Sequence, residues 1–500
     1  MSDTFIIFPN SLFAKNIYIN NKTNVYIIEH PVYFTKYNYH KMKLVLHRAS
    51  MRYYNDYIKS KYKCKVTYIN FEYKLSKLFK QFTNKTISMY DPVDHFVMNH
   101  IKKLSDKFST TLDIKDTPLF MTKINDLEKY ANSKDKYLHS DFYKYQRKKH
   151  NILVKKNKPL KGKWSFDIHN RLSFPKSFKN NYIPRKQNNK YIQEAKRYIN
   201  KHFPDNPGSP DIYVPIDHKG AKAHYKLFIK SRLRCFGPYQ DAVDKNILFG
   251  CHSIISPMLN IGLLEPKYII DYAEKYGLKN RIPMQSLEGF IRQVIGWREI
   301  QRLVYVFDRQ KMEKGNFFNH RRKLDTDVWF YGEKSTGIIV MDDMIKKVLD
   351  KAYLHHIERL MYVGNFMLIN QIHPDNVFEW FMTLFIDAYH WVMYGNVYAM
   401  SQFSTGKLMM TRPYFSSSAY IARMSNYKKH KNKYPEVALG KNKYEWFEVW
   451  DALYYNFIAD NKKEFKKNYA IATQVKHWDK KTSAEKQSIK SIASKYMKKY

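Results

Sequence analysis

The sequence predicts an α/β domain followed by an all-α domain, and three observations lead to this fold class. Residues 1–135 alternate short β-rich segments with helical ones, as the βαβ units of a parallel sheet do. Residues 136–225 are basic and rich in Pro, Gly and Asn. From residue 226 onwards helical periodicity dominates. We therefore expect a Rossmann-like domain over 1–135, a basic connector over 136–225 and a helical domain over 226–500.

The first domain begins with two predicted strands, 4–8 (TFIIF) and 24–30 (NVYIIEH). A helix is predicted at 41–61 and a further strand at 64–71 (CKVTYINF). No GxGxxG follows the first strand, so the dinucleotide-binding fingerprint is missing. A ligand could still bind at the carboxyl ends of the strands, but the fold alone does not say which one.

The second domain is predicted to contain long helices at 284–307, 341–372 and 375–394 and a basic helical tail at 462–500. No internal repeat is found. Apolar residues make up 44% and aromatic residues 16% of the 500-residue chain, which is enough to bury sizeable cores. This composition excludes a disordered chain.

The chain is strongly basic, with a formal net charge of +42 from 87 Lys and Arg against 45 Asp and Glu. Such a balance favours a polyanionic partner, because a basic surface displaces the counterions of nucleic acid. Lys, Asn, Tyr and Ile are over-used together, as A/T-rich coding would produce, so a basic coat without a partner stays open. No run of 18 apolar residues occurs, and the first residues (MSDTFIIFPN) lack a signal-peptide pattern. We expect a soluble, intracellular protein without a membrane span.

The three cysteines, Cys64, Cys235 and Cys251, show neither CxxC spacing nor a Cys/His cluster. A disulfide framework and a closed zinc site are therefore not expected. We predict buried free thiols in a reducing compartment.

The stretch AYLHHIERLM, 352–361, is predicted to be helical and contains two adjacent histidines, His355 and His356, followed by Arg359. Residues three and four apart on a helix are neighbours, so at least one histidine shares a face with this arginine. Asp387, expected on a neighbouring aromatic helix, could pair with Arg359. A satisfied core pair and a functional pair are both open readings of these histidines.

Two further segments contain residues suited to binding. Ser253 and Ser256 precede Pro257 where a helix is expected to begin, so they form either a phosphate site or an ordinary helix cap. Gln293 and Trp297 lie one turn apart with Arg298 beside them, so this set could hydrogen-bond and stack on a base, or the tryptophan could pack in a core.

Aromatic residues are dense around the histidine segment. Trp329, Trp380, Tyr389 and Trp391 are among them. Such residues are core packing by default, and only a nearby redox cofactor would make them an electron path.

Many ordered segments of the chain together resemble the photolyase and cryptochrome superfamily, in its branch of deoxyribodipyrimidine photolyase-related proteins. The segments are FPNSLF, EHPVYF, KLVLHRASMRYY, HSIISPMLNIGLL, MQSLEGFIRQVIGWRE, AYLHHIERLMYVGNFMLI, WFMTLFIDAYHWVMYGNVYAMSQF and TRPYFSSSAYIARMSNY. They run along almost the whole chain. The resemblance implies an N-terminal antenna domain and a C-terminal helical domain that binds FAD.

The resemblance also implies positions for the cofactor. Ser253 and Ser256 would hold the FAD phosphates, Arg359 and Asp387 would form an ion pair beside the flavin ring, and Asn396 would lie near flavin N5. A ribityl-lumazine antenna chromophore in the α/β domain is a further expectation, without assigned contacts.

For the reaction, the resemblance places His356 where (6-4)-specific members have their catalytic histidine, with His355 beside it, both facing the lesion. A histidine with a pKa near working pH could deliver the proton that the (6-4) adduct needs. Gln293 and Trp297 would contact the flipped-out lesion. Trp380, Trp329 and Trp391 would carry electrons during photoreduction, although Phe381 replaces a redox-active tyrosine of some relatives.

The sequence departs from the best-known members of this branch at their four iron–sulphur cysteines. The expected CxxC positions hold Lys428 and Lys431, and neither Val340–Asp343 nor Tyr444–Glu448 contains cysteine. Because such clusters require thiolate ligands, we expect neither the cluster nor another metal. Aromatic packing is expected to fill the space.

The leading interpretation is a light-dependent (6-4) DNA photolyase that binds UV-damaged DNA as a monomer. A cryptochrome-like blue-light sensor, a cyclobutane-dimer photolyase and a flavin-free basic DNA-binding protein are the alternatives. His356 and Gln293, together with the positive charge, favour repair of the (6-4) lesion.

Overall fold

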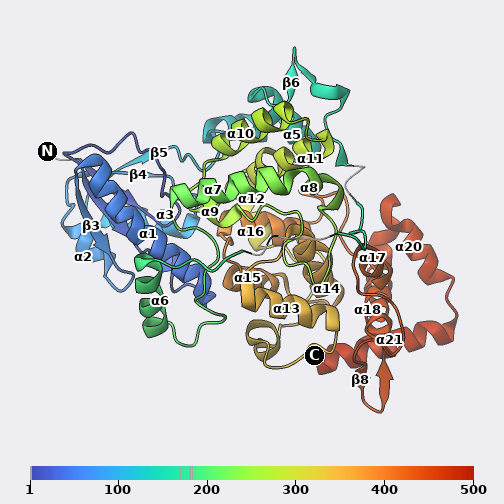
Figure 1. The fold of residues 1–500 in the computed structure, drawn as a ribbon. Helices are drawn as coiled ribbons and strands as arrows, with labels where there is room; N and C mark the ends of the chain where they lie inside the picture. Colours follow the sequence, from blue (N-terminus) through green and yellow to red (C-terminus); the bar gives the residue numbers. More distant parts are fainter. Residues whose placement is uncertain (1–2, 168–170, 179–181, 183) are drawn as a thin grey trace.

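The computed structural model describes residues 3–167, 171–178, 182 and 184–500. Its N-terminal part is a five-stranded, all-parallel sheet with strand order β3-β2-β1-β4-β5 and with helices around it (Figure 1). The strands are β1 (Thr4–Ile7), β2 (Asn24–Ile28), β3 (Lys65–Ile69), β4 (Thr86–Tyr90) and β5 (Thr111–Lys115). The helices are α1 (Lys41–Tyr62), α2 (Leu75–Lys80), α3 (His95–Lys107) and α4 (Ile124–Asn132). The predicted parallel α/β fold is confirmed, and its strand order reverses between β1 and β4.

The segment predicted as a basic connector contains regular structure that packs on both parts of the molecule. Its elements are α5 (His139–Lys149), the hairpin β6 (Val154–Lys155) and β7 (Lys158–Pro159), α6 (Lys190–His202) and the start of α7 (His218–Ser231). Helix α6 packs along α1, whereas α5 packs against the π-helical segment Arg292–Arg298 of the helical region (Figure 1). The segment predicted as a connector therefore packs against both the α/β region and the helical region.

The rest of the chain is helix-rich, as predicted. Its α-helices are α8 (Leu233–Tyr239), α9 (Ser256–Asn260), α10 (Pro266–Lys279), α11 (Met284–Ile291), α12 (Glu299–Glu313), α13 (Ile339–Lys351), α14 (Asn365–Ile369), α15 (Pro374–Leu384), α16 (His390–Tyr394), α17 (Ser418–Met424), α18 (Trp446–Asp460), α19 (Lys462–Lys466), α20 (Tyr469–Asp479) and α21 (Ser483–Lys499). Further π-helical segments are Asp327–Tyr331, Glu358–Gly364 and Gly395–Ser401, and β8 (Val437–Leu439) pairs with β9 (Asn442–Tyr444). Helices α17 to α21 form the end of the molecule farthest from the sheet (Figure 1).

Two of the predicted long helices are interrupted. The predicted helix 341–372 ends at α13, where Ala352 adopts a left-handed conformation (φ 49°) and its N–H bonds to Val348 O. Helical structure resumes only at His356. The predicted helix 375–394 is broken at 385–389, between α15 and α16, so Asp387 lies in a connection and not on a helix. Apolar periodicity continues through both breaks because the connections are buried as well, so it could not reveal them.

The connection 385–389 is held by side chains of the α/β domain. Lys43 of α1 donates hydrogen bonds from Nζ to Ala388 O (2.7 Å) and to Met382 O (3.2 Å). His47 Nε2 lies 2.6 Å from the Tyr389 hydroxyl, and His390 Nδ1 donates to Asp94 Oδ2 at 2.5 Å. All of these side chains are almost fully buried. The sheet domain therefore anchors the backbone on both sides of Asp387.

Several buried histidines make the protein sensitive to acid. Burial lowers the pKa of His30 and His47 to about 3 and of His40 to about 4, from an ordinary value of 6.5. Above pH 6.5 these rings are neutral in both states, so they add no pH dependence. Below pH 6.5 the unfolded chain binds protons that the folded protein excludes, and stability falls as pH falls towards the folded pKa. At pH 5 we expect a loss of about 2 kcal/mol for each such histidine.

The check is urea unfolding at pH 7.5, 6 and 5, with the midpoint expected to fall at each step below pH 6.5. The variant His430→Asn, which changes an exposed ring, should follow the same profile. A midpoint that stays constant from pH 7.5 to 5 would contradict the proposed burial of neutral histidines.

The prediction for the cysteines is wrong for two of the three. Cys235 of α8 and Cys251 form a disulfide, whereas Cys64 is a buried free thiol, as predicted. The Cα atoms of the pair lie 5.9 Å apart, within the usual range for a disulfide. The packing of residues 249–252 beside α8 creates this proximity, and a sequence separation of 16 residues does not announce it.

No helix within the described ranges is both long and apolar enough to cross a membrane. Among the same residues, no group of three or more His, Cys, Asp or Glu side chains is arranged to hold a metal ion.

Candidate functional site

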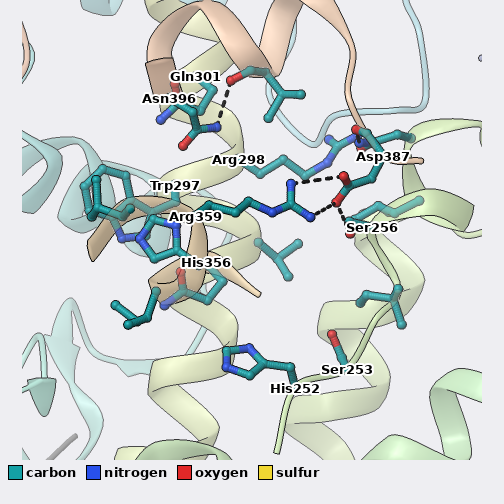
Figure 2. A pocket seen from close by; sticks show the side chains of 18 of the residues that line it. His252, Ser253, Ser256, Trp297, Arg298, Gln301, His356, Arg359, Asp387 and Asn396 are labelled. Atoms are coloured by element: carbon teal, nitrogen blue, oxygen red, sulfur yellow. Dashed lines mark hydrogen bonds and ion pairs between the residues drawn. The ribbon is translucent and has the colours of Figure 1, made fainter. Parts of the chain in front are cut away.

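One cavity in the helical region gathers most of the residues that the sequence singled out. Its walls come from the start of α9, the π-helical segment Arg292–Arg298, residues 353–360 and the chain from 387 to 401. The sequence-predicted residues that line it are Ser253, Ser256, Gln293, Trp297, His356, Arg359, Asp387, Trp391 and Asn396. His355, Trp380 and Trp329 are absent from the lining. Residues from four separate stretches of sequence thus meet in one place (Figure 2).

The cavity wall contains the expected ion pair of Arg359 and Asp387. The guanidinium donates to both carboxylate oxygens, at 3.0 Å and 3.1 Å, in a bidentate arrangement (Figure 2). Ser256 Oγ donates a third hydrogen bond to Asp387 Oδ2 at 2.6 Å. Asn260 Nδ2 donates to the Asp387 backbone carbonyl at 2.9 Å, which fixes the connection. The pair is a rigid, directional group at the edge of the cavity.

The two adjacent histidines point in different directions, because Tyr353 to His355 are not helical and the helix begins at His356. His356 presents an exposed ring to the cavity, where desolvation by the surrounding protein and then the charge of Arg359 lower its pKa to about 4. His355 is buried and stacks on His252, with ring centroids 4.3 Å apart and planes at 9°. The expectation that both rings face the cavity is therefore wrong for His355.

Trp297 forms an aromatic platform at the cavity wall, and its support comes from a residue that the sequence did not indicate. His139 of α5 stacks on the indole at 3.9 Å between centroids, with planes at 13°. His356 approaches from within the cavity, at 6.5 Å and 33°. Gly296 leaves the room for His139, because a Cβ there would lie 2.7 Å from His139 Nε2. His139 lies 158 residues before Trp297 in the chain, so only folding unites them.

Comparison with known proteins shows which proteins the chain is similar to. Residues 5–213 match the family model for deoxyribodipyrimidine photo-lyase-related proteins. A (6-4) photolyase of Agrobacterium fabrum is 29% identical over 473 residues, which are 92% of this chain and 91% of the relative. Along most of its length the chain is therefore similar to a photolyase, and its N-terminal part matches the photolyase-related family model.

Solved structures of photolyases and cryptochromes have the same fold. A bacterial class III photolyase from Agrobacterium tumefaciens superposes with a TM-score of 0.57 at 15% identity, covering 92% of this chain and 98% of that one. A cryptochrome of Synechocystis sp. PCC6803 superposes with a TM-score of 0.55 at 15% identity, covering 84% of this chain and 88% of that chain. These likenesses establish the fold, an α/β region with a parallel sheet followed by a helix-rich region.

The tryptophans that the resemblance links to photoreduction in this superfamily fall into two separate groups. Trp380 and Trp329 pack edge to face at 6.0 Å, and Trp380 Nε1 donates to Trp329 O at 2.7 Å. Phe381, which lines the cavity, packs on Trp380 at 5.0 Å. Trp391 lines the cavity elsewhere and packs on Phe120 at 4.8 Å.

The positions that would hold iron–sulphur ligands in this superfamily branch make contacts of other kinds. Lys428 Nζ donates to the carbonyls of Ala422 and Ser425, at 2.8 Å and 2.9 Å. Tyr427 donates to Asp343 at 2.7 Å. Trp446 and Trp450 of α18 are fully buried. That aromatic packing fills the space of the cluster stays a prediction.

Further polar residues line the cavity beyond those assigned from the sequence, among them Asp241, Arg298 and Gln301. Burial raises the pKa of Asp241 to about 7, and burial lowers the pKa of Arg298 to about 9. Gln301 of α12 is fully buried. Sequence reasoning named Arg298 only as a neighbour of Trp297 and missed the other two. No local pattern distinguishes Asp241 or Gln301 from surface residues, because their setting is made by distant elements.

Proposed function

We propose that this protein is a light-dependent (6-4) DNA photolyase with non-covalently bound FAD. The observation that carries the proposal is a single cavity in which His356 and Trp297 lie together with the Arg359–Asp387 ion pair. A base-repair enzyme of this kind needs a stacking platform, a proton donor and a charged cofactor clamp in one space. UV-damaged DNA is the proposed partner, held by the positive charge of the chain, and the protein is proposed to act as a monomer.

The polar atoms of the cavity fit a flavin dinucleotide. Arg359 and Asp387 are proposed to lie beside the flavin ring and Asn396 near N5, with Ser253 and Ser256 at the phosphates. Trp391 Nε1 and Arg298 Nε are buried on the cavity wall without a hydrogen-bond partner among the described residues. Such unpaired donors are costly unless a ligand supplies acceptors. When bound and reduced, FAD supplies on excitation the electron that opens the lesion.

His356 is proposed as the proton donor to the lesion. With a pKa of about 4 the ring is neutral at physiological pH, so the expectation of a pKa near working pH is not met. A neutral imidazole still presents an N–H to a lesion atom that gains negative charge, and that charge raises the proton affinity of the ring. His355, stacked on His252 and 3.7 Å from Glu358, is proposed to position His356 and not to touch the lesion.

Trp297 and Gln293 are proposed to receive the flipped-out lesion, with His139 supporting the indole from behind. A stacked ring loses rotational freedom before the lesion arrives, so less ordering is needed on binding. For photoreduction we propose the path Trp329, Trp380 and Phe381, because these rings are in contact and lead to the cavity. Trp391 packs on Phe120 instead, so it is not part of this path. We propose that it acts at the cavity wall.

The residues at the carboxyl edge of the sheet do not fit a ribityl-lumazine. In parallel α/β sheets this edge is the usual ligand site. Here Phe8, His30, Tyr33, His47 and Tyr389 fill it, each at most 3% exposed. His30 Nε2 and His100 Nδ1 share a hydrogen bond at 3.0 Å, and His47 bonds to Tyr389. No antenna step is therefore derived for this edge.

The test is an oligonucleotide with one defined (6-4) lesion, incubated with the protein under blue light and in the dark, beside an oligonucleotide with a cyclobutane dimer. Light-dependent restoration of the (6-4) oligonucleotide alone supports the proposal. Restoration of the cyclobutane dimer alone would reassign the substrate. Bound flavin without repair of either lesion would favour a blue-light sensor, to which the structural likeness to a cryptochrome points. A colourless protein that cannot be reconstituted with FAD would refute every flavin-dependent reading.

A further inference from the structure

Gln301 is a buried amide without a partner. It projects from α12, is 1% exposed and lines the cavity. Neither Oε1 nor Nε2 has a hydrogen-bond partner in the part of the chain that the structure describes. Most buried side-chain amides in folded proteins are satisfied, so both ends being unpaired requires an explanation.

The amide of Gln301 lies against Gly395. A Cβ on Gly395 would lie 1.8 Å from Gln301 Oε1, so only glycine at this position permits the observed side chain. Asn396 follows directly, and Figure 2 shows Asn396 and Gln301 together at one end of the cavity. The Asn396 amide donates to Val392 O at 2.7 Å and is therefore not engaged with Gln301. A second amide, without a hydrogen-bond partner among the described residues, thus lies beside the first.

We infer that Gln301 binds the polar edge of the flavin ring, an inference that rests on the proposed function. A carboxamide presents one donor and one acceptor side by side. The pyrimidine part of an isoalloxazine presents the complementary pair, the C4 carbonyl as acceptor and N3–H as donor. This edge adjoins N5, to which Asn396 is assigned. Gln301 Nε2 donates to the C4 carbonyl and Gln301 Oε1 accepts from N3–H.

If Gln301 binds a ligand, its replacement should affect the stability of the flavin-free protein differently than if Gln301 supports the fold. If the Gln301 amide has hydrogen-bond partners only in a ligand, replacing it with an apolar side chain of similar size removes an unsatisfied polar group. This change then does not destabilise the apoprotein. If the amide supports the fold, the same change lowers the thermal midpoint. The substitution Gln301→Met separates the two because methionine has a similar length and adapts its shape.

The experiment compares binding of FAD and of N3-methyl-FAD, which lacks the N3–H donor, to flavin-free protein. Wild-type protein should bind the methylated analogue at least about tenfold more weakly, as loss of a buried hydrogen bond predicts. Gln301→Met should bind FAD about tenfold more weakly than wild type and should lose the discrimination between the two flavins. Its apoprotein should unfold at the same temperature as the wild type or higher.

Gln146→Met is the matched control. Gln146 of α5 is also buried, but it accepts a hydrogen bond from Thr122 Oγ1 at 2.9 Å and is absent from the cavity lining. This variant should unfold at a lower temperature and keep the wild-type preference for FAD over N3-methyl-FAD.

Each other outcome has a distinct meaning. Wild-type protein that binds both flavins equally overturns the inference while leaving the proposed function intact. A Gln301→Met variant with undiminished discrimination, or with a lowered apoprotein midpoint and unchanged FAD affinity, also overturns it. Wild-type protein that binds neither flavin overturns the proposed function and the inference with it.

Discussion

Replacing His356 with asparagine should reduce light-dependent repair of the (6-4) oligonucleotide by about 100-fold or more while leaving FAD bound. The factor is that of a lost general acid, because asparagine can fill the space and hydrogen-bond but cannot transfer a proton at physiological pH. FAD should remain because His356 is proposed to face the lesion and the flavin contacts come from other residues. The measurements are single-turnover repair and the flavin absorbance per protein.

The exposed His430→Asn variant controls for the loss of a histidine elsewhere. Repair should remain at the wild-type level in that protein. If His356→Asn also repairs at the wild-type rate, His356 is not the proton donor, and the neighbouring Asp241, with its pKa near 7, becomes the group to test.

Replacing Asp387 with asparagine should have the largest effect on the cofactor site. The change leaves the Arg359 guanidinium without its counter-charge in a place where the side chain is 16% exposed, and it puts an amide N–H₂ against guanidinium N–H groups. Breaking a buried ion pair by removing one partner costs about 3–5 kcal/mol. We expect a lower thermal midpoint and a purified protein with little bound FAD, measured by melting and by absorbance.

Asp271→Asn is the matched control, because it breaks an ion pair with Lys267 in which both side chains are more than half exposed. An exposed pair of this kind contributes about 0.5 kcal/mol or less, so melting and flavin content should hardly change. An Asp387→Asn protein with wild-type flavin content would remove the ion pair from the proposed cofactor site.

The ion pair also links the two parts of the molecule. The backbone around Asp387 is held by Lys43, His47 and Asp94, all from the α/β domain, and by Asn260 of α9. The α/β domain therefore also positions the Asp387 carboxylate for its ion pair with Arg359. A buried lysine that donates to two backbone carbonyls is costly to place and easy to disturb.

Sequence patterns predicted those features that depend on local periodicity. The βαβ alternation in the first 135 residues led correctly to a parallel sheet, and Ser256 with Pro257 correctly marked the start of α9. The opposite charges of Arg359 and Asp387 correctly predicted their ion pair. Asp387, however, lies in a connection and not on a helix. The same periodicity misled at Ala352, because a buried left-handed turn keeps the apolar pattern of the helices around it.

The sequence by itself determined the order of α/β and helical parts, the positive charge, the absence of cysteine at the expected cluster positions and nine of the residues that line the cavity. Only the tertiary structure decided that His355 turns away from His356, that Cys235 pairs with Cys251, that His139 supports Trp297 and that Gln301 is left unpaired over Gly395. The physical reason is range. Periodicity and charge act between neighbours along the chain, whereas burial, stacking and hydrogen-bond partners depend on residues that folding alone brings together.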